Sequence, residues 1–102
     1  MKLNILQRIL IFSVLPKEGT LLTMKTLKGL KDKITFSEDE VKEYEIRIEE
    51  NSYRWNPEKD VEVDFDITDG ESELVTAGLK ELDSQEKLME QHLSLFELFP
   101  IE

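Results

Sequence analysis

Residues 36–67 read FSEDEVKEYEIRIEENSYRWNPEKDVEVDFDI, and the repeat of the apolar residues changes within this stretch. Ser37, with Glu40 three residues later, forms a capping box, the pattern that marks the first turn of a helix. The acidic residues of that turn also suit the positive end of the helix dipole. This pattern predicts a short helix over residues 38–44.

The rest of the stretch alternates between apolar and polar residues, as is typical of strands with one buried face. We expect a hairpin with strands over residues 44–49 and 53–55 and a turn at residues 50–52. A third strand is expected over residues 61–67, where the alternation has no fault. Together these segments predict a small three-stranded antiparallel sheet.

Apolar residues three and four positions apart predict further helices on both sides of the sheet. Two precede it, over residues 3–13 and from about residue 20 to residue 33, and two follow it, from Thr68 to about residue 82 and over residues 85–98. The predicted fold class is α+β, with three N-terminal helices, a three-stranded antiparallel sheet and two C-terminal helices in a single domain of 102 residues. Three helices followed by a hairpin is also the order of elements in a winged helix.

The composition argues against several functions. The chain has 23 acidic and 13 basic residues, a net charge of -10. Direct binding to nucleic acid or to an anionic membrane is therefore not expected, because affinity for phosphate comes mainly from Lys and Arg. Cysteine is absent, which excludes disulfides, thiolate zinc sites and cysteine nucleophiles.

The apolar start of the chain, residues 1–15, is not expected to be a targeting segment. Gln7 and Arg8 interrupt the apolar run, and Pro16 follows where a signal peptide would have small residues. The run is also too short to span a bilayer. We expect a buried amphipathic helix here, and a cytoplasmic protein.

Charge is distributed unevenly along the chain. Residues 1–33 carry a net charge of +5, and residues 34–102 carry -15. Lys25, Lys28 and Lys31 lie near one another on one side of the second predicted helix. We interpret them as a solvated face that pairs with acidic residues of the same molecule.

No group of residues predicts catalysis, a cofactor or a metal. His92 is the only histidine, has no partners at a triad spacing, and is expected at the edge of the core. Residues 64–71 resemble a calcium loop, but Asp69 stands where the loop needs Gly and Val75 where it needs Glu. Tyr53, Trp55 and Phe65 are interpreted as core residues rather than as a platform for stacking bases.

Two segments are candidates for binding a partner protein. The C-terminal run over residues 93–101 is apolar on nearly every side, and a helix of that kind must be covered. We expect part of it to meet a second subunit. The residues of this predicted surface are Leu95, Phe96, Leu98 and Phe99.

The second candidate is acidic. Glu62, Asp64 and Asp66 alternate along the third predicted strand and so point the same way, and Glu45 and Glu49 would lie near them across a common sheet. Like charges this close destabilise a sheet, so a function is plausible. The row is either a solubilising face that resists edge pairing or a mimic of nucleic-acid phosphates.

Several stretches resemble small proteins encoded in bacteriophage and prophage genomes. They are residues 4–8, 15–19, 36–40, 79–82 and 92–95. The resemblance extends over most of the chain and implies a viral origin and a small accessory role. It implies no activity, cofactor or binding residue.

These observations favour a non-enzymatic protein-interaction module of phage origin, which acts as a homo-oligomer or as an adaptor for a protein partner. The alternative is an acidic inhibitor that mimics nucleic acid and blocks a nucleic-acid-binding host protein. Neither interpretation requires a cofactor.

Overall fold

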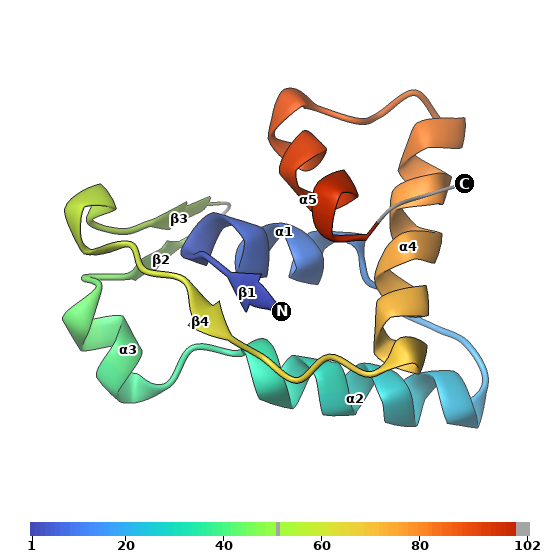
Figure 1. Ribbon diagram of the computed structural model, residues 1–102, viewed down its shortest axis with the longest axis horizontal. Helices are drawn as coiled ribbons and strands as arrows, with labels where there is room; N and C mark the ends of the chain where they lie inside the picture. Colours follow the sequence, from blue (N-terminus) through green and yellow to red (C-terminus); the bar gives the residue numbers. More distant parts are fainter. Residues whose placement is uncertain (51, 100–102) are drawn as a thin grey trace.

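The computed structural model describes residues 1–50 and 52–99 and shows a mixed helical and sheet architecture (Figure 1). Asn51 of the predicted turn and residues 100–102, which include Ile101 of the apolar C-terminal run, lie outside the described residues. The elements in chain order are β1 (Lys2–Leu3), α1 (Ile5–Val14), α2 (Leu21–Ile34), α3 (Glu38–Glu43), β2 (Arg47–Glu49), β3 (Ser52–Arg54), the 3-10 turn η1 (Pro57–Lys59), β4 (Val63–Asp64), α4 (Asp69–Ser84), the 3-10 turn η2 (Glu90–His92) and α5 (Leu93–Leu98).

Helix α1 lies in the middle of the molecule, with α2, α4 and α5 around it and the β2–β3 hairpin beyond its start (Figure 1). The main core forms where these four helices meet. Its fully buried members come from every one of these helices or from the residues beside them: Leu3, Ile11, Leu30, Ile34, Val75, Leu79, Leu95 and Phe99.

A second, smaller core lies between the start of α1, the end of α3 and the hairpin. Ile5, Tyr44 and Ile46 are buried in it. Partly buried side chains cover these three, among them Phe36 and Trp55. This small core sets the position of the hairpin on the body of the protein.

Arg8 of α1 lies between the two cores and is only 1% exposed. Its guanidinium donates to the backbone oxygens of Ile34 and Thr35, each at 2.9 Å, and to both carboxylate oxygens of Glu40 at 2.7 and 3.2 Å. It also stacks over the Phe36 ring at 4.1 Å from the ring centroid. One side chain therefore ties α1 to the end of α2 and to the start of α3.

Glu40 has a second role, because it is the glutamate of the predicted capping box. Its Oε1 accepts from the backbone N–H of Ser37 at 3.0 Å while the Ser37 hydroxyl caps the Glu40 N–H. The same design recurs at α4, where Glu71 closes a capping box with Thr68 and accepts from Lys33 Nζ of α2. Each glutamate joins a local helix start to a distant element.

The closest approach between helices involves Gly78 of α4. A Cβ atom at this position would overlap the carbonyl oxygen of Val14 at the end of α1. Gly29 of α2 is different, because a Cβ atom there would lie 3.5 Å from the Glu71 carboxylate, an ordinary contact. Of these two glycines, only Gly78 is required by the contact between helices.

The predicted helices before residue 45 correspond to α1, α2 and α3, with one correction at the first. We expected a helix from residue 3, but Asn4 caps α1 through a box with Gln7, and the helix starts at Ile5. Lys2 and Leu3 instead form the strand β1.

The prediction of one three-stranded sheet is wrong. The described residues form two separate two-stranded antiparallel sheets, β2–β3 and β1–β4. Of the third predicted strand, over residues 61–67, only residues 63–64 form a strand, and they pair with residues 2–3 rather than with the hairpin. Without a third strand beside the hairpin, the order of elements does not correspond to a winged-helix sheet.

The prediction of a helix over residues 85–98 is also wrong in its first half. Glu86 has φ 58°, the Lys87 N–H donates to the Leu82 carbonyl and the Glu86 N–H to that of Asp83. This is a Schellman motif, which ends α4. Ser84 is therefore the last residue of α4, and the final helix α5 begins only at Leu93.

The packing at Gly78 predicts a large difference between two glycine variants. Gly78→Ala should lower the free energy of unfolding by roughly 2 kcal/mol or more, because α1 and α4 must move apart. Gly29→Ala is the control and should be neutral or stabilising by up to about 1 kcal/mol, since alanine favours a helix. Urea unfolding followed by circular dichroism measures both, and equal destabilisation would contradict the assigned contact.

The two capping-box glutamates predict acid sensitivity. The hydrogen bond from Arg8 holds the pKa of Glu40 below its ordinary value of 4.5. Burial acts to raise the pKa of Glu71, but the hydrogen bonds from Lys33 and Thr68 outweigh it and the net pKa is also lowered. Stability from these groups is therefore complete above the unfolded-chain value of 4.5 and is lost as the pH falls through the lower folded-state pKa values.

Urea midpoints measured between pH 7 and pH 3 test this expectation. Glu40→Gln should be less stable than the parent at pH 7 and should lose less stability on acidification. Glu97→Gln, at an exposed position on α5, controls for the change in net charge. If Glu40→Gln and the parent lose the same stability on acidification, the ion pair with Arg8 is not the cause.

Candidate functional site

The apolar face of the β2–β3 hairpin extends beyond the core that it covers. Near the body, Ile46 is buried and Trp55 is half-buried in the small core. One step further out, Ile48 and Tyr53 are directly opposite each other in the ladder, and they are 70% and 42% exposed. We call Ile48 and Tyr53 the hairpin face.

A groove of about 500 Å³ adjoins the hairpin face along β3. Trp55, Tyr53 and Leu6 supply its apolar surface, and Pro57 at the start of η1 forms part of its wall. Its lining also includes the polar residues Asn4, Arg54 and Asp60. We call this the aromatic groove.

The charged side chains around the aromatic groove have different hydrogen-bond and ion-pair partners. Arg54 Nε lies 3.4 Å from the Glu49 carboxylate. Asp60 Oδ1 accepts from the Ile5 N–H at 3.1 Å, and this contact places the carboxylate at the start of α1. Glu45 accepts from Asn56 at 2.7 Å, and this hydrogen bond lowers the pKa of Glu45.

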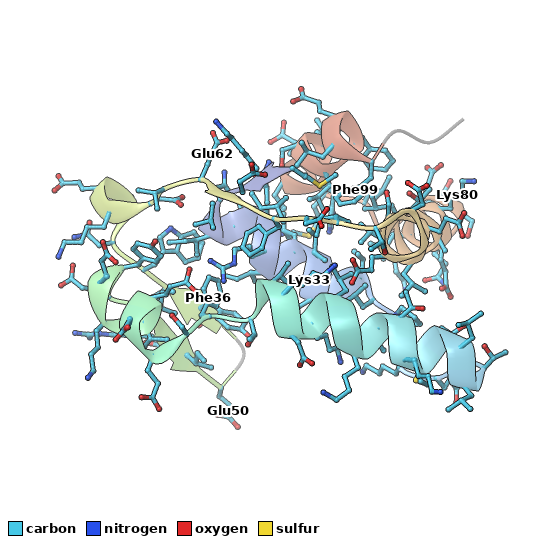
Figure 2. All side chains as sticks on the ribbon, turned by 60° about the horizontal axis from the view of Figure 1, so that its bottom comes forward. Lys33, Phe36, Glu50, Glu62, Lys80 and Phe99 are labelled. Carbon is cyan, nitrogen blue, oxygen red and sulfur yellow. The ribbon has the colours of Figure 1, made fainter. Side chains whose placement is uncertain are left out.

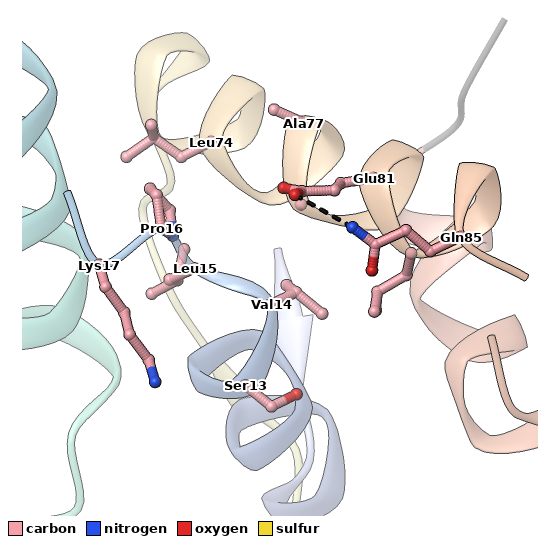
Figure 3. A pocket seen from close by; sticks show the side chains of 11 residues that line it. Ser13, Val14, Leu15, Pro16, Lys17, Leu74, Ala77, Glu81 and Gln85 are labelled. Atoms are coloured by element: carbon pink, nitrogen blue, oxygen red, sulfur yellow. Dashed lines mark hydrogen bonds between the residues drawn. The ribbon is translucent and has the colours of Figure 1, made fainter. Parts of the chain in front are cut away.

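A second groove, of about 310 Å³, runs between the end of α1 and α4 (Figure 3). One wall consists of residues 13–17. The other consists of the α4 face from Leu74 to Leu82, with Gln85 directly after the helix. The Ser13 hydroxyl donates to the Leu10 carbonyl at 2.6 Å, and Glu81 accepts from Gln85 at 3.3 Å. Each of these polar groups is thus bonded to a neighbour three or four residues away in the sequence.

His92, the single histidine of the chain, is bonded within its own turn. His92 is buried, as expected, and its Nδ1 accepts from the Met89 N–H at 2.9 Å. Within residues 1–50 and 52–99, no cluster of three or more Asp, Glu, His or Cys residues has the arrangement of a metal site.

The predicted C-terminal surface is largely covered by the protein itself. Leu95 and Phe99 are fully buried in the main core, so they present no surface to a partner; Phe99 lies between α5 and α4 (Figure 2). Phe96 and Leu98 are half-buried against the same core. The reason is that the early end of α4 lets α5 fold back onto the helices.

The acidic row is exposed as predicted but its surroundings differ. Glu62, Asp64 and Asp66 all face solvent, and Glu62 is visible on the outside of the molecule (Figure 2). Lys2, not Glu45 or Glu49, is opposite Asp64, and the amino group of Met1 lies 2.9 Å from the Asp64 carboxylate. The expected like-charge repulsion across a sheet is therefore wrong, since a cation faces the middle of the row.

The lysines of α2 fit the expected pairing within the molecule in part. Lys28 pairs with Asp32 on the same helix at 2.9 Å. Lys33 joins Glu71 and also donates to the Asp66 carbonyl at 2.7 Å. Lys25 and Lys31 are exposed on the same helix.

Sequence reasoning missed the hairpin face and most of the aromatic groove. Strict alternation placed Ile48 on the same buried face as Tyr44 and Ile46. Tyr44 and Ile46 are buried in the small core, whereas Ile48 is 70% exposed. The length of the alternating segment was the available signal. The alternation continues as far as the turn, and a core as small as this one covers only the base of the hairpin. The contribution of Leu6 and Asp60 depends on tertiary structure and had no local signal.

No helix within the described part of the chain is both long and apolar enough to cross a membrane. Comparison of the chain with protein-family models, with curated protein sequences and with solved structures gives no match.

Proposed function

We propose that this protein is a non-enzymatic protein-interaction module, an accessory protein of phage origin that acts in the cytoplasm. The observation that carries the proposal is the hairpin face. Ile48 and Tyr53 form an exposed apolar pair that continues directly into the aromatic groove. Contiguous exposed apolar surface beside a groove is characteristic of sites that bind proteins or ligands.

The surface is suited to a protein because of its residue types. Tyr, Trp and Arg are the residues that most often dominate binding energy at protein interfaces. Tyr53, Arg54 and Trp55 are consecutive here, and all three line the aromatic groove. The half-buried apolar pair Phe96 and Leu98 on α5 is a smaller surface of the same kind.

The second candidate, a mimic of nucleic acid, is supported by one observation. Glu62, Asp64 and Asp66 stand in an exposed row on one side of the chain. The nearby Lys2 and the Met1 amino group reduce the negative field of that row, which makes it the weaker candidate.

A comparative capture experiment tests the proposal. The parent protein and a double variant, Ile48→Thr with Tyr53→Thr, are immobilised and exposed to host lysate, and the captured proteins are quantified by isotope-labelled mass spectrometry. The double variant should capture at least about tenfold less of the specifically bound proteins than the parent, because the hairpin face supplies the apolar contact.

The control is a second double variant, Leu21→Thr with Leu22→Thr. These leucines are 72% and 75% exposed on α2, far along the chain from the hairpin, so apolar area is removed at a different site. Capture should survive in this variant. Equal capture by all three proteins would contradict the proposal. If added DNA reduces the amount of captured protein, that result would favour the mimic of nucleic acid.

A further inference from the structure

Strand β3 has a free edge that faces the aromatic groove. In an antiparallel pair, every second residue of a strand at the sheet edge directs its N–H and C=O away from its partner strand. β3 pairs only with β2, and among the described residues no other backbone hydrogen bond involves residues 52–55. The edge therefore offers unused donors and acceptors beside an apolar groove.

An isolated two-stranded hairpin is marginal on its own, and it gains stability from an added strand or from packing. Only the base of this hairpin packs on the small core, through Ile46 and Trp55. Among the residues that the structure describes, no third strand or helix covers the outer pair, Ile48 and Tyr53, which are 70% and 42% exposed. An added strand along β3 would bring side chains over both Tyr53 and the aromatic groove.

The charges select the chemistry of the added strand. Arg54 is paired with Glu49, and Lys59 of η1 is paired with Glu45. Arg47 is exposed on β2 opposite Arg54 and is not part of the groove lining. Among the described residues, the groove carboxylate of Asp60 accepts only the Ile5 N–H, through one oxygen. Glu58 is exposed next to Pro57, and the whole chain carries a charge of -10. A second copy of this protein carries the same net charge of -10, and this disfavours it as the occupant of the site. The complementary ligand is an extended peptide that is apolar and basic.

From this placement we infer that β3 binds an extended basic peptide segment of a partner protein by strand addition, with an apolar side chain of the peptide in the groove between Leu6, Trp55 and Pro57. This inference rests on the proposed function and names the partner's recognised segment. Main-chain hydrogen bonds supply affinity in this mode of binding, and alternate side chains supply specificity.

The test uses synthetic nine-residue peptides and the full chain. One peptide alternates Val and Lys, and a second alternates Val and Glu. Two further peptides have the Val–Lys sequence with N-methylated backbone amides: in one peptide the amides of the Val residues are methylated, and in the other those of the Lys residues. Binding is followed by amide chemical shifts of the labelled protein. The Val–Lys peptide should shift residues 52–60 and Leu6 and should bind at least about tenfold more tightly than the Val–Glu peptide.

The N-methylated peptides distinguish strand addition from contact of another kind. Only one set of alternate amides faces β3, so one N-methylated peptide should lose roughly tenfold or more in affinity and the other should stay near the parent. Equal loss in both peptides, or no loss in either, would overturn the inference.

Asp60→Asn provides a matched variant of the protein, because asparagine keeps an oxygen for the Ile5 N–H and removes the charge. It should weaken the Val–Lys peptide by roughly fivefold and leave a Val–Ser peptide unchanged. Failure of all peptides to bind, or shifts confined to α2 or α5, would also overturn strand addition. These peptide results would leave the proposed function intact if the double variant, Ile48→Thr with Tyr53→Thr, still loses captured proteins in the lysate experiment. Failure of strand addition can therefore be distinguished from failure of the proposed function.

Discussion

The buried guanidinium of Arg8 is the interaction on which the rest of this structure depends. Burying a charge is costly unless its partners satisfy it completely. Here two backbone carbonyls and both oxygens of Glu40 accept from it, and the rings of Phe36 and Phe65 lie 4.1 and 5.0 Å from its central carbon. Loss of the Glu40 carboxylate would leave the buried positive charge uncompensated, and loss of a carbonyl acceptor would leave a buried N–H unpaired. The geometry at this point is therefore strongly determined.

The position of the proposed binding surface follows from that constraint. Arg8 fixes the start of α3 against α1, and the end of α3 leads into the hairpin through a second Schellman motif, in which the Ile46 N–H donates to the Val41 carbonyl. The hairpin is thus held at its base by the small core while its outer pair remains in solvent. The aromatic groove forms between β3 and the start of α1. The relative position of these two elements depends on the same contact between Arg8 and the start of α3.

Local signals in the sequence were sufficient for much of this fold. The Ser37–Glu40 box was read correctly, and the apolar spacing placed α2 and α4 within a few residues. The C-terminal ends of α3 and α4 were harder to predict. Glu45 and Glu86 follow these helices in the left-handed conformation, which glycine usually adopts, and a glutamate in the sequence does not indicate such a turn. The pairing of β1 with β4 and the role of Arg8 depend on contacts distant in sequence, so no window along the chain predicts them. The same holds for the candidate site, whose groove combines residues from α1, β3 and η1.

A double-mutant cycle on Arg8 and Glu40 tests this account most directly, with the free energy of unfolding measured for Arg8→Met, Glu40→Gln and the combined variant. We predict that Arg8→Met alone costs roughly 3 kcal/mol or more, because it leaves Glu40 and two carbonyls without their donor. The coupling energy between the two positions should be at least about 1.5 kcal/mol. Single-variant costs that simply add, with each below about 1 kcal/mol, would contradict the view that this ion pair organises the fold.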